Sequence, residues 1–175
     1  KAYSGKIEID GEELSDIDEI SLRKKINFVQ QNPYIFQDTL EFNICLRHDV
    51  EKKELDKVIE LVNLKELIRK LPNGVKTVLS DNGNNLSGGE KQRVILAAAY
   101  CSDADVYILD EPTSGMDGDG LHSIIKWVKL LSEKGKIVVI ITHDSLLAEA
   151  TSDKFLYLEE GKQIKGGKKV LYEYN

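Results

Sequence analysis

The 175-residue chain is poor in the residues that build disulfide-rich and membrane-spanning proteins. It holds two cysteines, Cys45 and Cys101, with three prolines, one methionine and one tryptophan. Two cysteines allow a single pair, which is too few for the disulfide framework of a small secreted domain. No apolar run approaches the roughly 20 residues that a membrane-spanning helix needs. We therefore expect any attachment of this chain to a membrane to come through a partner.

Positive charge is also in short supply. The chain has 30 acidic and 24 basic side chains, and its net charge is −6. Proteins that bind nucleic acid usually carry a basic face, so this balance argues against a nucleic-acid partner. With 41% hydrophobic and 31% charged residues, the composition is that of a globular protein. The length is sufficient for one domain with a buried core.

What the chain does have is a glycine-bearing loop, Leu86–Glu90, that opens a predicted helix. Ser87 is a favourable N-cap residue, and Glu90 lies three positions later, which is the spacing of a capping box. Gly88 and Gly89 cost conformational entropy in the first turn, so packing alone does not explain them. They leave the positively polarised start of the helix open to close approach. The loop therefore suits an anion, phosphate above all, and an ordinary capped helix is the competing interpretation.

A second feature is an apolar strand, Val106–Leu109, that ends in two adjacent carboxylates. A continuous apolar run predicts a parallel strand buried on both faces. Ligands of open parallel sheets bind at the carboxyl ends of the strands, which is where Asp110 and Glu111 stand. Asp110 suits contact with Mg²⁺, and Glu111 suits a general base that orients and polarises an attacking water. The competing interpretation is that two solvent-facing acids merely end a strand.

Three segments, taken in order, resemble the nucleotide-binding domain of an exporter-type ATP-binding cassette (ABC) transporter. They read LSGGEKQR from residue 86, VYILDEPTSGMD from residue 106 and IVVIITHD from residue 137. The resemblance covers nearly the whole chain and implies an α/β fold, with a parallel sheet core like that of P-loop NTPases and a helical subdomain. It implies a single nucleotide-binding domain, in which residues 1–36 and 104–175 form the ATPase core. Residues from about 37 to 103 would then form the helical subdomain with the signature motif.

The resemblance also implies roles for the residues of these segments. Asp110 would be the magnesium-binding aspartate and Glu111 the catalytic glutamate. His143, which follows another apolar strand, would be the switch histidine that contacts the γ-phosphate of ATP. Asp117, in the turn called the D-loop, would make a contact across a dimer of cassettes. The nucleotide-contacting residues of the signature motif would be Ser87, Gly88, Gly89 and Glu90.

The loop after a predicted strand at Ile26–Val29 resembles the Q-loop of the family, with the functional glutamine at Gln31. Its amide oxygen would join the Mg²⁺ shell and contact the attacking water, so Gln31 has both a catalytic and a metal-binding role. Gln30 is the competing assignment. Taken alone, the segment also fits a polar surface loop, in which Pro33 ends any regular element. The stretch that follows, Phe36–Ile44, resembles the corresponding part of exporter-type cassettes.

A further loop, Thr77–Gly83, resembles the one that precedes the signature motif in exporters and reaches toward the coupling helices of the membrane domain. Exporters usually place a glutamate where Asp81 stands, so the carboxylate is kept but is shorter. A plain connecting loop is an equally good interpretation of these residues.

Periodicity and turn residues predict the remaining elements. A helical region is expected at 51–71, with a second short helix over 65–71. An apolar stripe in its first half is expected to be buried; it consists of Leu55, Val58, Ile59 and Val62. A hairpin is expected at 6–11, and helices at 21–25, 120–134 and 145–150. Strands at 155–158 and 170–172 would be joined by a glycine- and lysine-rich turn over 161–169.

One segment that the resemblance requires is not found. No string of the form G-x-x-x-x-G-K-[ST], the phosphate-binding P-loop, occurs in the 175 residues. The family places this loop upstream of the part that Lys1–Gly11 resembles. The P-loop supplies most of the amides and the lysine that hold the β- and γ-phosphates. We therefore expect an N-terminally truncated cassette with weak or no ATP binding and no meaningful hydrolysis of its own. We also expect exposed apolar surface that favours dimerisation.

The sequence thus predicts the ATP-binding subunit or domain of an exporter-type ABC transporter, at the cytoplasmic face of the cell membrane. Its cofactors would be ATP and Mg²⁺. Its partners would be a second cassette in a head-to-tail dimer and the transmembrane domains of a transporter. The alternative, supported by the missing P-loop, is a non-catalytic interaction module that completes the ATP site of a partner cassette. Chromosome-maintenance and DNA-repair ATPases share similar motifs, but no sustained heptads indicate their coiled coils.

Overall fold

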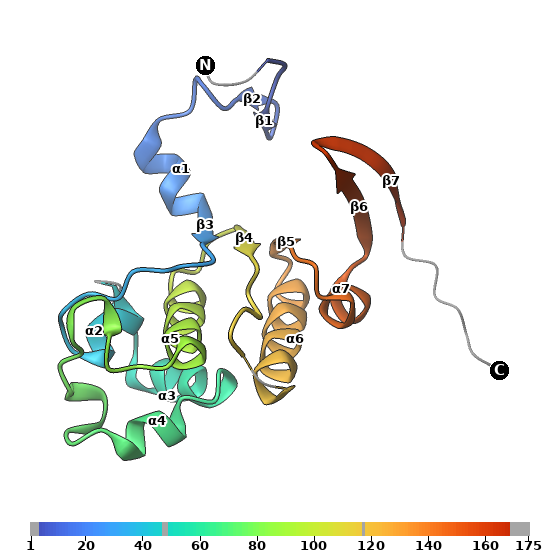
Figure 1. The fold of residues 1–175 in the computed structure, drawn as a ribbon. Coiled ribbons are helices and arrows are strands. Elements are labelled where there is room, and N and C mark those ends of the chain that lie inside the picture. The colour runs from blue at the N-terminus through green and yellow to red at the C-terminus, as the bar shows by residue number, and fades with distance from the viewer. Residues whose placement is uncertain (1–3, 47–48, 117, 169–175) are drawn as a thin grey trace.

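A three-stranded parallel sheet lies at the centre of the computed structural model, which describes residues 4–46, 49–116 and 118–168. Its strands are β3 (Ile26–Val29), β4 (Val106–Asp110) and β5 (Ile137–Ile141), in that order across the sheet (Figure 1). All three run in the same direction, with Asp110 beside Ile141 at the carboxyl end of the sheet. The predicted α/β class with a parallel sheet is confirmed.

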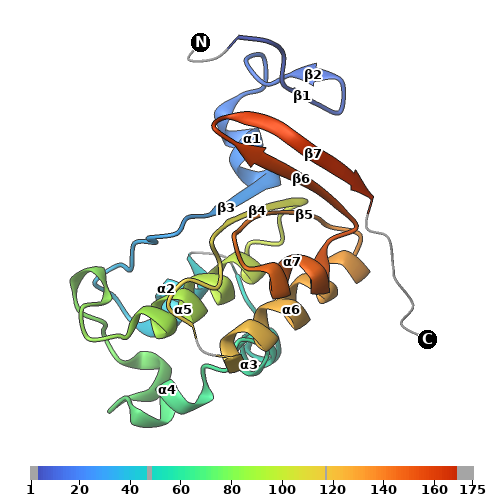
Figure 2. The ribbon, with the colours of Figure 1, turned by 45° about the vertical axis from the view of Figure 1, so that its right-hand side comes forward.

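Two long helices, α5 (Gly88–Cys101) and α6 (Gly118–Glu133), cover one face of the sheet (Figure 2). Tyr107 and Leu109 of β4 are fully buried. Tyr107 packs edge-to-face on Trp127 of α6, with ring centroids 5.6 Å apart, and Trp127 is also fully buried. Such aromatic pairs contribute roughly 0.5–1.5 kcal/mol beyond the area that they bury. A large part of the core therefore lies between the sheet and these two helices.

The opposite face of the sheet is open, and this corrects the expectation that its apolar strands are buried on both faces. Ile137, Val139 and Ile141 alternate along β5 and are 60%, 47% and 52% exposed. Phe28 of β3 is 51% exposed. The expectation assumed that a continuous apolar strand has a covering layer on each side, whereas the long helices lie on one side. The exposed apolar surface that the sequence led us to expect lies here.

A group of short helices lies between the Q-loop and the signature motif in the sequence, and its first two members pack against α5. The group consists of α2 (Leu40–Cys45), α3 (Lys52–Leu61), α4 (Lys65–Lys70) and the 3₁₀ turns η1 (Gly74–Lys76) and η2 (Asp81–Gly83). The predicted stripe of α3 and the residue after it is buried as expected. The helical region predicted at 51–71 divides after α3, where Asn63 has a left-handed φ of 56°. Burial of apolar stripes on these helices extends the core away from the sheet.

The N-terminal part of the described chain forms a small hairpin and a helix. β1 (Glu8–Ile9) pairs with β2 (Glu12–Glu13) around the predicted turn, and α1 (Glu19–Lys25) leads into β3. Asp18 caps α1 by accepting a hydrogen bond from the Ser21 N–H at 2.9 Å. Ile7, next to the hairpin, is 45% exposed, so this part of the chain lies outside the main core.

The C-terminal part differs from its prediction at one element. After α7 (Ser145–Thr151), β6 (Lys154–Glu159) pairs with an antiparallel β7 (Lys162–Lys168), which occupies most of the turn expected over 161–169. The reversal needs only Glu160 and Gly161, both with positive φ. The strand predicted at 170–172 lies outside the described residues. None of the described helices is long and apolar enough to span a membrane.

Candidate functional site

The predicted capping box closes the start of α5. The Ser87 hydroxyl accepts a hydrogen bond from the Glu90 N–H at 3.3 Å, and the Glu90 carboxylate accepts one from the Ser87 N–H at 2.8 Å. Gly88 and Gly89 form the first turn, where backbone N–H groups have no partner within a helix. The side chains of the loop thus fix the helix start and leave its glycine amides available to a ligand.

The two glycines of this loop have different surroundings. A Cβ at Gly88 would meet no atom within 4 Å, so the backbone there is open to an approaching group. A Cβ at Gly89 would lie only 3.1 Å from the carbonyl oxygen of Gly115, in the turn that follows β4. Gly115 has a φ of 73°, a conformation that favours glycine. Gly88 therefore fits a ligand role, whereas Gly89 allows the signature loop to lie against the D-loop.

Glu111 follows directly on β4 and has an unusual backbone conformation. Its φ of 47° lies in the left-handed region, which costs a non-glycine residue on the order of 1 kcal/mol or more. The Glu111 N–H donates to the carbonyl oxygen of Ile141 at 2.9 Å, which continues the β4–β5 pairing past the last strand residue. The side chain is 18% exposed. Strain of this kind gathers at functional sites, where the surrounding structure holds it in place.

Glu111 is bound to His143 through one carboxylate oxygen. The His143 backbone N–H donates to Glu111 Oε1 at 3.1 Å, and the ring Nδ1 lies 2.9 Å from the same atom. The hydrogen bond to the carboxylate, and then its negative charge, raises the pKa of His143 above its usual value. The imidazole is 89% exposed, so a ligand can reach the ring. The structure thus brings together the two residues that the shared sheet edge predicts.

Asp110 ends β4 at the same edge and is half-buried. Among the described residues, no three His, Cys, Asp or Glu side chains gather closely enough to hold a metal ion. Magnesium often uses only one or two carboxylates and fills the rest of its shell with water and substrate phosphates. The donor set here therefore fits Mg²⁺ that arrives with a nucleotide, and does not fit a metal held by protein groups alone.

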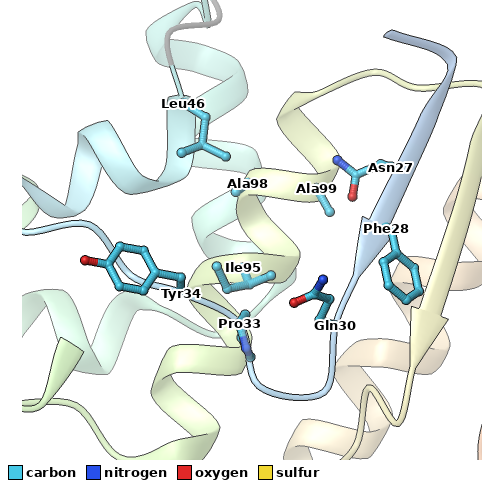
Figure 3. Close-up of a pocket in the computed structure, with 9 residues that line it drawn as sticks. All are labelled: Asn27, Phe28, Gln30, Pro33, Tyr34, Leu46, Ile95, Ala98 and Ala99. Carbon is cyan, nitrogen blue, oxygen red and sulfur yellow. The ribbon is translucent and has the colours of Figure 1, made fainter. Parts of the chain in front are cut away.

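Gln31 lies in the Q-loop (residues 30–36), just beyond the carboxyl end of β3, and is exposed. Within the described part of the chain, no hydrogen bond joins it to Asp110, Glu111 or His143. The structure therefore places Gln31 at the same edge of the sheet without bringing it to the carboxylates. Gln30, the competing assignment, lies toward α5 instead (Figure 3).

Asn43 of α2 holds the far end of the Q-loop. Its side-chain oxygen accepts a hydrogen bond from the Phe36 N–H at 2.8 Å, and its Nδ2 donates to the carbonyl oxygens of Phe36 and Thr39, each at 3.0 Å. Asn43 is only 2% exposed. A buried amide that is satisfied in this way fixes the backbone that it binds. The loop between β3 and α2 is therefore anchored at its α2 end.

A pocket of about 200 Å³ opens between β3, the Q-loop and α5 (Figure 3). The α5 wall is apolar and the Q-loop side is mixed. Its lining consists of Asn27, Phe28, Gln30, Pro33, Tyr34, Leu46, Ile95, Ala98 and Ala99.

The loop that includes Thr77 and Leu79 pairs with the start of α2. The Leu40 N–H donates to the Thr77 carbonyl oxygen, and the Leu79 N–H donates to the Asp38 carbonyl oxygen, each at 2.9 Å. The loop predicted to reach toward the membrane domain therefore lies beside the segment that follows the Q-loop.

Comparison with known protein families identifies this arrangement. The family model described as ABC transporter matches residues 1–114, which is more than half of the chain. The chain belongs to the ABC transporter family.

Proteins similar to this ABC chain include transport proteins and a solved exporter. It is 38% identical over 98% of its length to the pediocin PA-1 transport/processing ATP-binding protein PedD of Pediococcus acidilactici, covering 24% of that protein. It is 35% identical over 94% of its length to the ATP-dependent lipid A-core flippase of Vibrio vulnificus, covering 28% of it. A solved bacterial Atm1-family ABC exporter with ATP bound superposes with a TM-score of 0.87 at 28% identity, covering 95% of this chain and 29% of that one. The chain thus spans about a quarter of the length of these relatives, and its fold is that of an exporter-type nucleotide-binding domain.

Within this ABC fold, the predicted residues fall into two groups. Glu111 and His143 are in direct contact, and Asp110 lies beside them in the chain. The signature residues 87–90 stand at the start of α5, against the D-loop turn. Asp117 lies outside the described residues. The functional roles of all these residues remain predictions.

Sequence reasoning misses two residues that shape the site. Asn43 anchors the Q-loop, but a single asparagine in a helix gives no signal of it. Thr142 donates from its Oγ1 to Glu111 Oε2 at 3.3 Å. Its spacing of two residues from Asp144 is typical of a hydroxyl that accepts a backbone N–H, and that local pattern was the available clue.

Proposed function

We propose that this chain is the ATP-binding part of an exporter-type ABC transporter, in which ATP hydrolysis drives transport across a membrane. The contact of Glu111 Oε1 with His143 Nδ1 at 2.9 Å is the observation that carries this proposal. It sets a carboxylate base and an imidazole side by side at the carboxyl end of a parallel sheet, where such folds bind their ligands.

In this function Glu111 orients the attacking water and accepts its proton as the water oxygen bonds to the γ-phosphorus, while the bond from that phosphorus to the bridging oxygen breaks and ADP leaves. His143, whose ring is largely exposed, donates to a γ-phosphate oxygen and keeps the water beside Glu111. Asp110 and the side-chain oxygen of Gln31 would hold Mg²⁺, which when bound would supply positive charge against the phosphates. The left-handed backbone of Glu111 aims its carboxylate back toward β5, where His143 stands.

The signature loop serves the nucleotide of a second cassette. Ser87 and Glu90 fix the start of α5, and the open backbone at Gly88 admits a phosphate. Helix starts with free N–H groups favour anions. In a head-to-tail pair of cassettes, Asp117 makes a contact across the dimer.

The chain alone binds ATP weakly or not at all and does not hydrolyse it. Asp110 and Glu111 place two acidic side chains where phosphate would sit, and no P-loop string in the 175 residues supplies the balancing amides and lysine. The groups that act on the nucleotide are therefore present without the groups that hold it.

The membrane-side partner docks at the pocket beside β3. Its apolar wall on α5 and its mixed rim on the Q-loop suit the amphipathic surface of a helix from a transmembrane domain. This partner would place the chain at the cytoplasmic face of the membrane. The division into an ATPase core (1–36 and 104–175) and a helical subdomain (about 37–103) puts the pocket between the two parts.

A non-catalytic module is the second candidate, and the intact capping box favours it. A chain without a P-loop can still present Ser87, Gly88 and Gly89 to ATP that is held by another cassette. In that case Glu111 and His143 never meet a nucleotide.

Calorimetry with Mg·ATP tests the proposal. We expect no heat from the chain alone, and binding with hydrolysis from a chain extended upstream by the P-loop segment of a related exporter. Glu111→Gln in the extended chain should abolish hydrolysis and retain binding. Tight binding by the 175 residues alone would contradict our account of the P-loop, and an extended chain that binds without hydrolysing would favour the module.

The module function has its own test. The chain is mixed with an intact cassette whose signature serine is replaced, and ATP hydrolysis is measured. Gly88→Arg, which fills the open approach, should remove any stimulation, whereas the exposed Asn84→Ala should not. Stimulation that survives Gly88→Arg would exclude a role for this loop.

A further inference from the structure

The hydroxyl of Thr142 lies between two groups that fix the direction of its proton. Its Oγ1 accepts a hydrogen bond from the Asp144 N–H at 3.0 Å. The same atom lies 3.3 Å from Glu111 Oε2, which as a carboxylate oxygen can only accept. Because one lone pair of the hydroxyl is already used by an N–H donor, its proton is directed to Glu111.

Thr142 and His143 bind different oxygens of the same carboxylate. Both donors of His143 reach Oε1, whereas Thr142 reaches Oε2. A carboxylate that is bound at one oxygen can still swing about that contact, but one bound at both cannot. Thr142 therefore removes a rotation that His143 alone would leave free.

The hydrogen bonds that support Oε1 and Oε2 of Glu111 also differ in how firmly their donors are held. The His143 ring is 89% exposed and can turn away from Glu111. Thr142 is half-buried, and its hydroxyl is bonded to the backbone of Asp144, whose own carboxylate accepts the N–H groups of Leu146 and Leu147 at 3.0 and 3.1 Å. The support on Oε2 is thus tied to the start of α7, whereas that on Oε1 includes an exposed ring.

We propose that Thr142 is a positioning residue for Glu111, and that it keeps the carboxylate oriented when His143 turns toward a phosphate. The inference rests on the proposed role of Glu111 as the general base, which it deepens. In this role Thr142 contacts neither the attacking water nor the nucleotide. It acts through Glu111 alone, by holding the oxygen that the imidazole leaves unbound.

Two variants separate the hydroxyl from the shape of the side chain. Thr142→Val keeps the branched shape and removes the hydroxyl, whereas Thr142→Ser keeps the hydroxyl. The readout is hydrogen exchange of the His143 backbone N–H, together with its ring ¹⁵N shifts, by NMR on the 175-residue chain at one pH without nucleotide. The loss of a hydrogen bond to a charged carboxylate corresponds to roughly tenfold or more faster exchange. We expect that change in Thr142→Val and recovery in Thr142→Ser.

A double-mutant cycle with Glu111→Ala decides whether the effect passes through Glu111. If it does, Thr142→Val no longer alters the His143 signals once the carboxylate is gone. If the change persists, Thr142 only shapes the turn before α7, and the proposal is wrong. Unchanged His143 exchange in Thr142→Val would overturn it as well. Because no nucleotide is present, these outcomes are independent of the ATP titrations that test the proposed function.

Discussion

The Tyr34 hydroxyl donates a hydrogen bond to Oδ1 of Asp81 over 2.8 Å, and this bond ties the Q-loop to the loop before α5. Both residues are exposed. The Tyr34 ring also packs edge-on against Phe36, with centroids 5.3 Å apart. The hydrogen bond to Asp81 raises the pKa of Tyr34 above its usual value, because only the neutral hydroxyl can donate. The two loops beside the pocket are therefore linked at their outer edge.

Removing the Tyr34 hydroxyl should loosen this link without unfolding the chain. In Tyr34→Phe we expect faster hydrogen exchange across 79–83 and little change in the urea midpoint, since exposed hydrogen bonds contribute little to stability. The folded pKa of Tyr34 is raised, so the bond is complete below its unfolded pKa near 10.0 and is lost as the pH rises through the folded value. Tyr157→Phe, on the exposed face of β6, is the matched control. Equal hydrogen-exchange rates across 79–83 in the two variants would show that the Tyr34–Asp81 hydrogen bond does not link the loops.

Replacing Glu111 should lower the pKa of His143. The carboxylate raises that pKa in the folded chain, so its contribution to stability is fully present below the unfolded value of 6.5 and is lost as the pH rises through the folded value. In Glu111→Gln we expect the pKa of His143 to move down, as followed by NMR of the ring protons. The signals of His122, on α6, provide an internal reference. A His143 titration that is unchanged in the variant would rule out the contact.

Truncating Asn43 should destabilise the fold. Asn43→Ala leaves the partly buried Phe36 N–H without its side-chain partner, and leaves the Phe36 carbonyl oxygen with the Asp38 N–H as its remaining donor among the described residues. A buried polar group that loses its partner costs about 1–3 kcal/mol, so we expect a loss of that size in the free energy of unfolding from urea titration. Asn32→Ala, in the exposed part of the Q-loop, should change it little. A similarly small change in the free energy of unfolding at both positions would show that water takes over the hydrogen bonds of Asn43.

The two signature glycines should respond in opposite ways to alanine. Gly88→Ala places its Cβ in open space and gains helix propensity, roughly 0.5–1 kcal/mol. Gly89→Ala pushes its Cβ against the Gly115 backbone, and forced contacts of this kind cost about 1–3 kcal/mol. Thermal melts of the two variants should therefore shift in opposite directions. A stabilised Gly89→Ala would mean that the D-loop turn can move aside.

Local sequence patterns predict much of this fold because local physics determines it. The bounds of β3, the Ser87–Glu90 capping box and the buried stripe that starts at Leu55 all follow from residue type and spacing within a few positions. The exposed face of β5 cannot be predicted in this way, because an apolar strand has the same sequence pattern whether or not a layer covers it. β7 was missed because a lysine- and glycine-rich segment becomes a strand only through pairing with β6.

The candidate site shows the same division. Asp110, Glu111 and His143 could be assigned to one edge from the sequence, since parallel strands end together. The contacts of Asn43 and Thr142 could not. Residue type alone does not show that Asn43 binds Phe36 seven positions earlier, and only tertiary structure brings Thr142 to Glu111. The separate surroundings of Gly88 and Gly89 likewise depend on where Gly115 lies.

The uncovered face of β5 makes the behaviour of this chain in solution depend on temperature and salt. Attraction between apolar surfaces weakens on cooling and strengthens with excluded salts such as sulfate. β5 is also rich in isoleucine and valine and lies at the edge of the sheet. It contains no charged residue or proline that would discourage a second strand from pairing with it. Cold, sulfate-free buffer should therefore keep the chain dispersed, whereas warming it or adding sulfate should increase its light scattering before any secondary structure is lost.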